Sequence, residues 1–262
     1  MQYSQIIPAF LVSLFASIGG AISGIGGGVV IKPVLDLVNF SDTAVISFLS
    51  GVTVLSMSVV TLLRSAKGNS RAELSFRISL FIAIGSVVGG IGGKLVFNKL
   101  LLYMESSSVS TTQSVILLVM IAGVILYMLN KKRIRTLHVT NPGVCIAVGL
   151  LLGASSSFLG IGGGPINIVI LFYLFSMDAK TAALNSIFVI LFSQISSLVY
   201  LMAGQAVPPF DWPVLLVMVA GGVAGAFIGR ALSQKMSHSM VEKLYSCLMV
   251  FVAVMCIVNI VR

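Results

Sequence analysis

The sequence predicts an all-α polytopic membrane protein, and three observations lead to this fold class. Of the 262 residues, 58% are hydrophobic and only 9% are charged, whereas soluble domains carry about 25% charged residues. Long apolar runs follow one another with short polar segments between them, and several reach the ~20 residues that cross a bilayer core. The same glycine-rich pattern, GIGGG, occurs once in each half of the chain. A soluble fold of this size could not keep so much apolar surface away from water.

Ten apolar runs are candidates for helices. In chain order they lie at 5–23, 29–40, 43–63, 74–103, 112–129, 143–159, 165–177, 181–203, 212–232 and 241–261. The first run lacks a preceding basic stretch, so we expect it to belong to the mature protein and not to a cleaved signal peptide. The runs at 29–40 and 165–177 are too short to cross a bilayer comfortably, and each follows a glycine cluster.

An internal repeat divides the chain into two halves, 1–135 and 136–262, which together form one membrane domain. A shift of 136 residues aligns Gly24 to Lys94 with the second half without a gap. Two GIGGG motifs coincide in this register: residues 24–28, the first motif, and residues 160–164, the second motif. A glycine ladder coincides as well, with Gly85, Gly89 and Gly93 in one half and Gly221, Gly225 and Gly229 in the other. Biased apolar composition alone would not place both features in one register.

Two arrangements of the halves are compatible with the runs. In the parallel arrangement each motif breaks one of eight crossing helices. In the inverted arrangement the segments on either side of a motif form two crossings or a re-entrant hairpin, and three transmembrane helices follow. Basic residues concentrate in cytoplasmic loops, and the inverted arrangement places 12 of the 16 Lys and Arg residues there. We therefore favour inverted halves, with both chain ends outside.

The GIGGG motifs are the first candidates for a binding site. Glycine adopts positive φ and weakens helices, so a cluster at membrane depth can open a helix, and such backbone persists only inside the protein or beside a cavity. Free amides and the helix dipole at the start of the next helix favour an anion. The candidate ligands are Gly24, Gly26, Gly27, Gly28, Gly160, Gly162, Gly163 and Gly164. The alternative role is close helix packing, which we expect for the glycine ladder.

Polar side chains near the motifs are further candidates. Lys32 lies one turn beyond the first motif, where it either reaches a bound anion or extends toward an interface near Asp36. The other candidates are Ser50, Asn167, Asn185, Ser186 and Gln194; each either donates to an anion or bonds to a neighbouring helix. Asp42 and Asp178 coincide in the repeat, and we expect both to cap helices rather than to carry protons.

Other functional classes fit the sequence poorly. The net charge of +9 comes from basic residues in short loops, as membrane insertion requires, and no groove-reading motif suggests a nucleic-acid partner. No histidine or pair of acidic residues lies inside the apolar runs, which argues against an intramembrane enzyme or a metal site. We expect no cofactor. The shortage of acidic residues also disfavours a cation channel.

The duplicated motif resembles a known family. Residues 24–33 read GIGGGVVIKP, and GIGGG recurs at 160–164; this pattern is similar to the sulfite exporter TauE/SafE family, also called the sulfonate-uptake permeases. The resemblance implies a multi-pass protein of the bacterial inner membrane type. It also implies a secondary transporter for small sulfur-containing anions such as sulfite or organosulfonates, held between the motifs with alternating access. A channel or carrier for another small solute is the alternative, and a homodimer is possible.

The second motif departs from the first at one position. Pro33 aligns with Val169, while Pro165 follows the second motif directly. We therefore do not expect the two halves of the site to be equivalent.

Overall fold

The computed structural model describes residues 6–67, 76–131, 133–204 and 206–261, and within them all regular structure is helical. The helices are α1 Ile6–Ser23, α2 Gly28–Leu37, α3 Thr43–Lys67, α4 Phe76–Tyr103, α5 Ser106–Asn130, α6 Pro142–Leu159, α7 Pro165–Phe175, α8 Ala179–Ala203, α9 Trp212–Lys235 and α10 His238–Val261. Eight of them are long and apolar enough to cross a membrane. The all-α polytopic class is therefore confirmed, and the protein is a multi-pass membrane protein.

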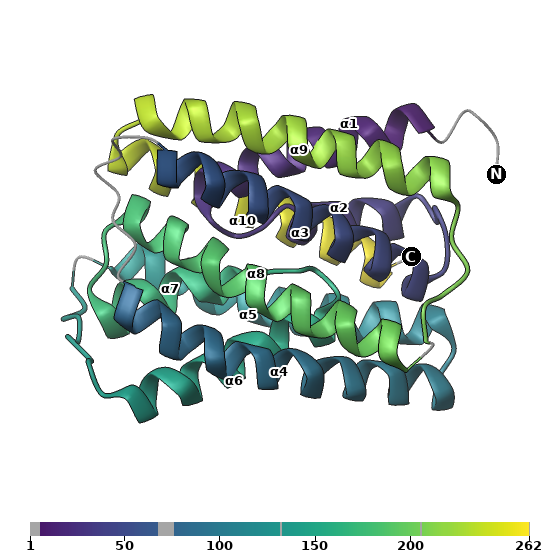
Figure 1. Cartoon of the computed structure of the whole chain (residues 1–262), viewed down its shortest axis with the longest axis horizontal. Helices are drawn as coiled ribbons and strands as arrows, with labels where there is room; N and C mark the ends of the chain where they lie inside the picture. Colours follow the sequence, from purple (N-terminus) through teal and green to yellow (C-terminus); the bar gives the residue numbers. More distant parts are fainter. Residues whose placement is uncertain (1–5, 68–75, 132, 205, 262) are drawn as a thin grey trace.

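The short helix α7 runs back toward the end of the molecule at which α6 begins, so that the two form a hairpin. The segment before α6 lies beside the end of α7, because the amide of Leu137 donates to the carbonyl of Tyr173 (2.7 Å) and that of Val139 donates to Leu174 (2.9 Å). The hydroxyl of Ser176 also donates to the carbonyl of Leu137 at 3.0 Å. Both ends of this hairpin therefore lie at the same end of the molecule, the left-hand end in Figure 1.

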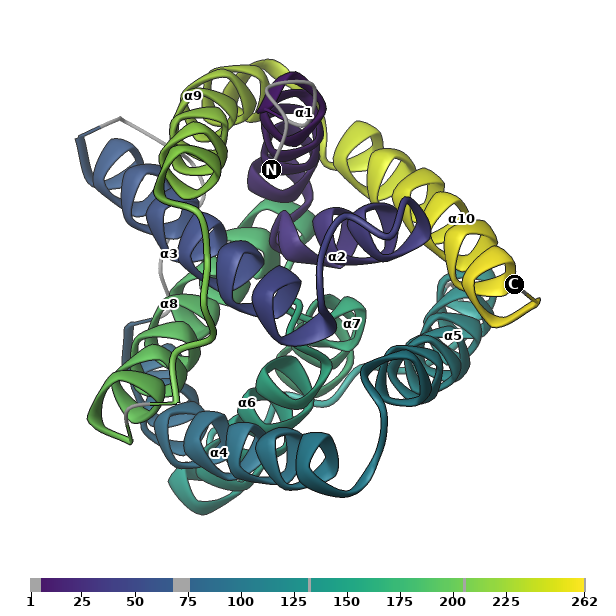
Figure 2. The same cartoon turned by 90° about the vertical axis from the view of Figure 1, so that its right-hand side faces the viewer.

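The helices α1 and α2 form a second hairpin. The two helices pack side by side. Both line one cavity, to which α1 contributes Leu11 and Ala16 and α2 contributes Val30 and Val34. This hairpin opens toward the opposite, right-hand end of the molecule (Figure 1), where α10 also ends. Viewed along the long axis (Figure 2), α2 and α7 lie inward of the α1–α9, α4–α6 and α5–α10 pairs.

The glycine ladder joins two pairs of helices. A Cβ atom at Gly85, Gly89 or Gly93 of α4 would overlap a carbonyl oxygen of α6, and a Cβ atom at Gly221, Gly225 or Gly229 of α9 would crowd one of α1. The ladder therefore lets helix backbones touch, as small residues do in membrane proteins. This packing is the role expected for it from the sequence.

Large apolar side chains cover the outside of the long helices. Phe15 of α1, Val119 of α5 and Leu216 of α9 are more than 60% exposed. The interior, by contrast, holds hydroxyl and amide side chains as well as two lysines and one arginine. This distribution suits a bilayer, because apolar side chains can face the hydrocarbon without a cost in free energy. Polar groups, by contrast, must find partners inside the protein.

Candidate functional site

Both GIGGG motifs interrupt the helical backbone. The first motif separates α1 from α2, and the second separates α6 from α7. Gly24 and Gly26 have φ of +80° and +84°, and Gly160 and Gly162 have φ of +64°. The backbone of a residue other than glycine adopts this left-handed region at a cost of about 1–2 kcal/mol. The glycines therefore do open the backbone, as their clustering predicts.

The two motifs meet inside the protein. A Cβ atom at Gly28 would overlap the carbonyl of Ile161, and one at Gly163 would overlap the carbonyl of Ile25. A Cβ atom at Gly26 would lie 3.4 Å from the carbonyl oxygen of Gly162. The N-termini of α2 and α7 therefore converge from opposite halves, and glycine is required because the backbones touch.

The amides of both motifs remain available. Within the described part of the chain, no acceptor is bonded to the amide of Gly26, Gly27 or Gly28, nor to that of any glycine from 162 to 164. Neither α2 nor α7 has a side-chain cap or an acidic residue in its first turn. Both helix starts thus present positive dipole ends and free donors to the same place.

Hydroxyl groups from α3 and α8 surround the motifs. The hydroxyl of Ser186 donates to the carbonyl of Gly24 at 2.6 Å. Ser50 is fully buried beside Gly28, and none of the described residues forms a hydrogen bond with its hydroxyl. Ser47, one turn earlier on α3, lies beside Gly160 and is likewise buried, with no hydrogen bond to any described residue. Of these, Ser47 was not anticipated from the sequence, although its spacing of three from Ser50 places both on one helix face.

Lys32 reaches from α2 to the second motif. It is 3% exposed, and its ammonium lies 2.8 Å from a carboxylate oxygen of Asp36. A Cβ atom at Gly160 would lie 3.5 Å from Cε of Lys32. The side chain therefore does not extend to the protein surface. It forms a buried ion pair at the junction of the two halves.

The remaining candidates divide between the site and the helix packing. Asn167 is 1% exposed on the first turn of α7, beside Gly164, and no residue in the described ranges donates to its side-chain oxygen. Asn185 instead accepts from Ser79 of α4 and donates to Thr181, so it links helices. Gln194 packs beside Gly51, where α3 passes α8. Asn185 thus fits the alternative role of bonding to a neighbouring helix, whereas Gln194 lies in the contact between α3 and α8.

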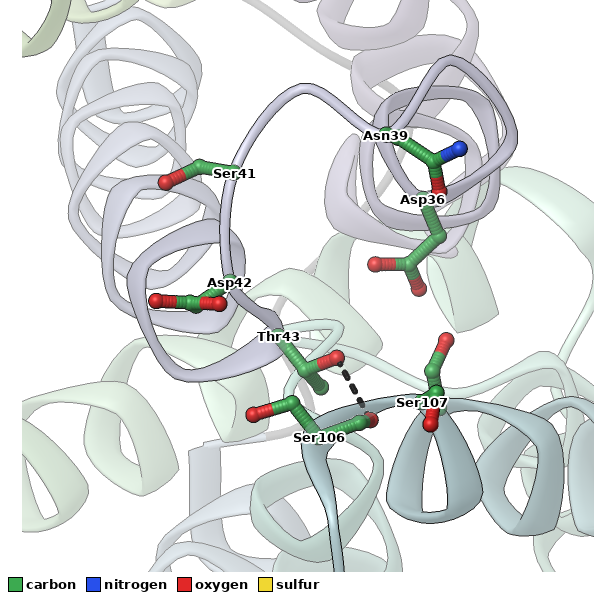
Figure 3. Close-up of a pocket in the computed structure, with 8 residues that line it drawn as sticks. Asp36, Asn39, Ser41, Asp42, Thr43, Ser106 and Ser107 are labelled. Carbon is green, nitrogen blue, oxygen red and sulfur yellow. Dashed lines mark hydrogen bonds between the residues drawn. The ribbon is translucent and has the colours of Figure 1, made fainter.

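A polar cavity adjoins the ion pair at one end of the molecule. It has a volume of about 460 Å³ and is lined by Asp36, Asn39, Ser41, Asp42, Thr43, Ser106, Ser107 and Ser110. Figure 3 shows the carboxylate of Asp36 and the hydroxyl of Ser107 pointing toward each other. Asp42 lines this cavity, whereas its repeat mate Asp178 accepts from the amides of Lys180 and Thr181 and caps α8. No sequence pattern indicates the cavity, since its serines precede an apolar run.

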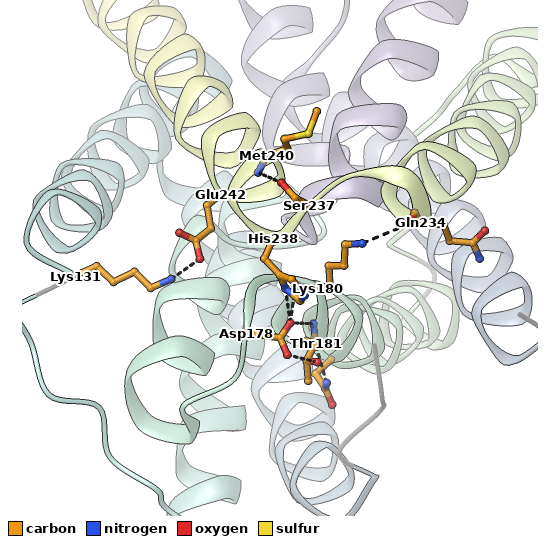
Figure 4. Close-up of polar contacts among 10 residues, drawn as sticks. Lys131, Asp178, Lys180, Thr181, Gln234, Ser237, His238, Met240 and Glu242 are labelled. Carbon is orange, nitrogen blue, oxygen red and sulfur yellow. Dashed lines mark hydrogen bonds and ion pairs between the residues drawn. The ribbon is translucent and has the colours of Figure 1, made fainter. Parts of the chain in front are cut away.

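Polar contacts join α5, α8, α9 and α10 at the other end of the molecule (Figure 4). Lys131 pairs with Glu242 at 2.6 Å, and His238 lies 2.9 Å from Asp178. Partial burial by itself would raise the pKa of Asp178, but the hydrogen bonds from Thr181 and Lys180 and the charge of His238 bring that pKa below its ordinary value. The cap is therefore an ionised carboxylate, as the helix N-terminus favours.

Comparison with known proteins agrees with this architecture. The model of the family described as "Sulfite exporter TauE/SafE" matches residues 9–256. The chain belongs to the sulfite exporter TauE/SafE family. It is 23% identical over 252 residues to the probable membrane transporter protein YunE of Bacillus subtilis, covering 86% of this chain and 88% of the relative. It is 28% identical over 123 residues to a probable membrane transporter protein of Xylella fastidiosa, covering 45% and 46% of the two chains. No solved structure gives a significant match.

These matches establish the general class of the protein. The family model spans nearly the whole chain, and the relatives are described as membrane transporters. The chain is therefore a membrane transporter of the TauE/SafE family in the cell membrane. The eight apolar helices long enough to cross a bilayer agree with that location.

Proposed function

We propose that the protein carries small sulfur oxyanions, such as sulfite or organosulfonates, and that the anion binds between the two GIGGG motifs. The observation that carries this proposal is the convergence of α2 and α7, whose uncapped N-termini meet with free amides. Two dipole ends and several donors attract an oxyanion and repel a cation. The match to a family of sulfite exporters supports sulfur oxyanions as the class of substrate.

The side chains around the motifs suit the same ligand. Lys32 supplies a cation next to Gly160. The hydroxyls of Ser47 and Ser50 and the amide of Asn167 supply polar groups beside the glycines. Because Asp36 holds the ammonium of Lys32, an incoming anion competes with this carboxylate. Binding therefore exchanges one ion pair of Lys32 for another, and the displaced Asp36 carboxylate then relies on the polar cavity that it lines.

The halves are proposed to be an inverted repeat. Contacts recur with the 136-residue shift: Gly24 packs on Ala183 while Gly160 packs on Ser47, and Gly26 packs on Ile190 while Gly162 packs on Val54. The glycine ladder repeats this relation, since the carbonyls that it meets on α6 and α1 are also 136 residues apart. The two hairpins opening toward opposite ends support inversion (Figure 1). Inverted halves around a central site suit alternating access.

Flux measurement in liposomes tests the proposal. Purified protein should carry sulfite or a short organosulfonate faster than it carries Na⁺ or an uncharged solute of similar size. Gly163→Val should reduce the flux at least tenfold, because its side chain would collide with the carbonyl of Ile25. The control is Gly123→Val, since a Cβ atom at Gly123 meets nothing within 4 Å. Equal flux in Gly163→Val, Gly123→Val and the unmodified protein would exclude the motif as the site.

A further inference from the structure

Lys94 is a buried cation that the proposed site does not use. It lies on α4, is 4% exposed, and has its ammonium 4.3 Å from the centre of the Phe97 ring. Among the residues that the structure describes, no carboxylate pairs with Lys94 and no acceptor bonds to its ammonium. Contact with an aromatic ring stabilises a cation by less than the burial of a lone ion costs. The ring is therefore not a sufficient partner for the ammonium.

The ammonium of Lys94 borders a cavity of about 300 Å³. The start of α3, the second half of α4, the end of α8 and the segment that follows α8 form its walls. The walls include Ala44, Phe97, Asn98, Leu101, Leu201 and Pro208. One charged group and one amide thus face an otherwise apolar space. This combination matches a ligand with a negatively charged head and an apolar body.

A second charge strengthens the demand for an anion. Lys32 is also a buried cation, and its charge repels that of Lys94. Lys32 has its own carboxylate, Asp36, whereas no carboxylate among the residues that the structure describes pairs with Lys94. An anion in the cavity would therefore offset both the burial of Lys94 and its repulsion by Lys32.

We propose that Lys94 forms a second anion-binding site, in which its ammonium binds the oxyanion head of a ligand and the apolar walls bind the ligand's carbon chain. This inference takes its ligand class, an organosulfonate, from the proposed function. The site lies toward the same end of the molecule as the start of α3, so it would hold a substrate before or after passage through the motifs. An acidic phospholipid has a related head and tail, and the test below separates the two sources.

Binding of 1-butanesulfonate to purified protein tests the site. The protein is assayed by calorimetry in nanodiscs made only of phosphatidylcholine. Lys94→Met, which keeps the length of the side chain, should weaken binding at least tenfold, and Lys94→Arg should recover part of the loss. Lys99→Met is the matched control, because Lys99 lies on the same helix but is exposed, and it should bind as the unmodified protein does. Ala44→Leu fills the cavity without removing charge, and should weaken 1-butanesulfonate more than methanesulfonate.

The outcomes separate this site from the proposed function. Equal binding of 1-butanesulfonate by Lys94→Met and Lys99→Met would overturn the second site, even where liposomes still transport sulfite. A lack of sulfite and sulfonate flux in the unmodified protein would instead contradict the proposed function. A second set of nanodiscs contains phosphatidylglycerol as well as phosphatidylcholine. If phosphatidylglycerol prevents the binding of 1-butanesulfonate, and Lys94→Met lowers retention of that lipid in native mass spectra, the site holds and its occupant is the lipid. Failure of the unmodified protein to bind either ligand would also overturn it.

Discussion

Lys32 is the residue at which the two halves of the proposed site depend on each other most directly. It belongs to the first half, yet its side chain lies against Gly160 of the second motif. The pair with Asp36 keeps the ammonium inside the protein. Buried pairs of this kind contribute little net stability, but removal of one partner leaves an uncompensated charge. A single substitution here therefore lowers the stability of the fold as well as changing anion binding.

Anion binding should respond in opposite directions to the two members of this pair. Lys32→Met combined with Asp36→Asn removes both charges and should weaken sulfite binding about tenfold or more, because a charged hydrogen bond contributes about 1.5–3 kcal/mol. Asp36→Asn alone frees the ammonium and should tighten sulfite binding. The measurement is thermal stabilisation of the purified protein as sulfite concentration rises. Unchanged stabilisation in the double variant would remove Lys32 from the site and leave the glycine amides as the proposed ligands.

At the scale of the helix, the glycine ladder shows how closely position decides the role of a small residue. Gly89 and Gly92 lie on the same helix, three residues apart. A Cβ atom at Gly89 would overlap the carbonyl of Leu150, whereas one at Gly92 would meet nothing within 4 Å. A glycine that touches a neighbouring backbone cannot be replaced without moving that helix. A glycine that faces open space only weakens its own helix.

Alanine substitution should therefore separate these two glycines. Gly89→Ala should push α4 away from α6 and lower the melting temperature of the detergent-solubilised protein by several degrees. Gly92→Ala should leave it unchanged or raise it, since alanine favours helix over glycine by about 1 kcal/mol. The check is thermal unfolding followed by circular dichroism. Equal melting temperatures for the two variants would contradict the close packing of α4 on α6.

The cap of α8 gives a pH dependence with a defined sign. Because the pKa of Asp178 is lowered in the folded protein, the carboxylate stabilises the fold above its unfolded pKa, about 3.9, and this contribution disappears as pH falls through the folded pKa. Asp178→Ala should cost about 1 kcal/mol at pH 7. The melting temperatures of Asp178→Ala and the unmodified protein should converge as pH falls below ~3.9. A gap that widens on acidification would contradict an ionised cap.

The sequence is informative about elements whose cause is local. Apolar length identified the long helices, and the shift of 136 residues identified the glycine positions that open the backbone. The apolar run predicts that α5 starts at 112, six residues after its actual start at Ser106, because a polar first turn carries no apolar signal. Asp36 and Ser47 were missed as well, since their importance depends on which helices meet at the motifs. The periodicity of a single sequence indicates the length of a helix, but it does not indicate which distant segments are in contact.

For the whole molecule, the charges at the two ends predict its orientation in the membrane. Figure 1 places the ends of α3, α5 and α9 and the starts of α4, α8 and α10 at one end. The basic residues there include Arg64, Arg77, Lys131, Lys180, Lys235 and Lys243. Asp42, Glu105 and Asp211 lie at the helix starts of the opposite end. The positive-inside rule then places the basic end in the cytoplasm.

Single cysteines test this orientation. In a background without Cys145, Cys247 and Cys256, a membrane-impermeant maleimide applied to intact cells should label Gly204→Cys, which follows α8. It should not label Gln234→Cys at the end of α9 unless the cells are permeabilised. Both positions are exposed in the structure. The reverse pattern would contradict the inverted arrangement and the cytoplasmic location of the basic end.

One helix outside the repeat motifs bonds to both of the short helices that begin at those motifs. The hydroxyl of Tyr245 donates to the carbonyl of Pro165 at 2.5 Å, and the amide of Asn259 donates to the carbonyl of Pro33 at 3.0 Å. Both donors belong to α10, so α7 and α2 are bonded to the same helix. A change in the tilt of α10 would therefore shift both contacts together. A substitution that moves α10 would thus alter both halves of the proposed site at once.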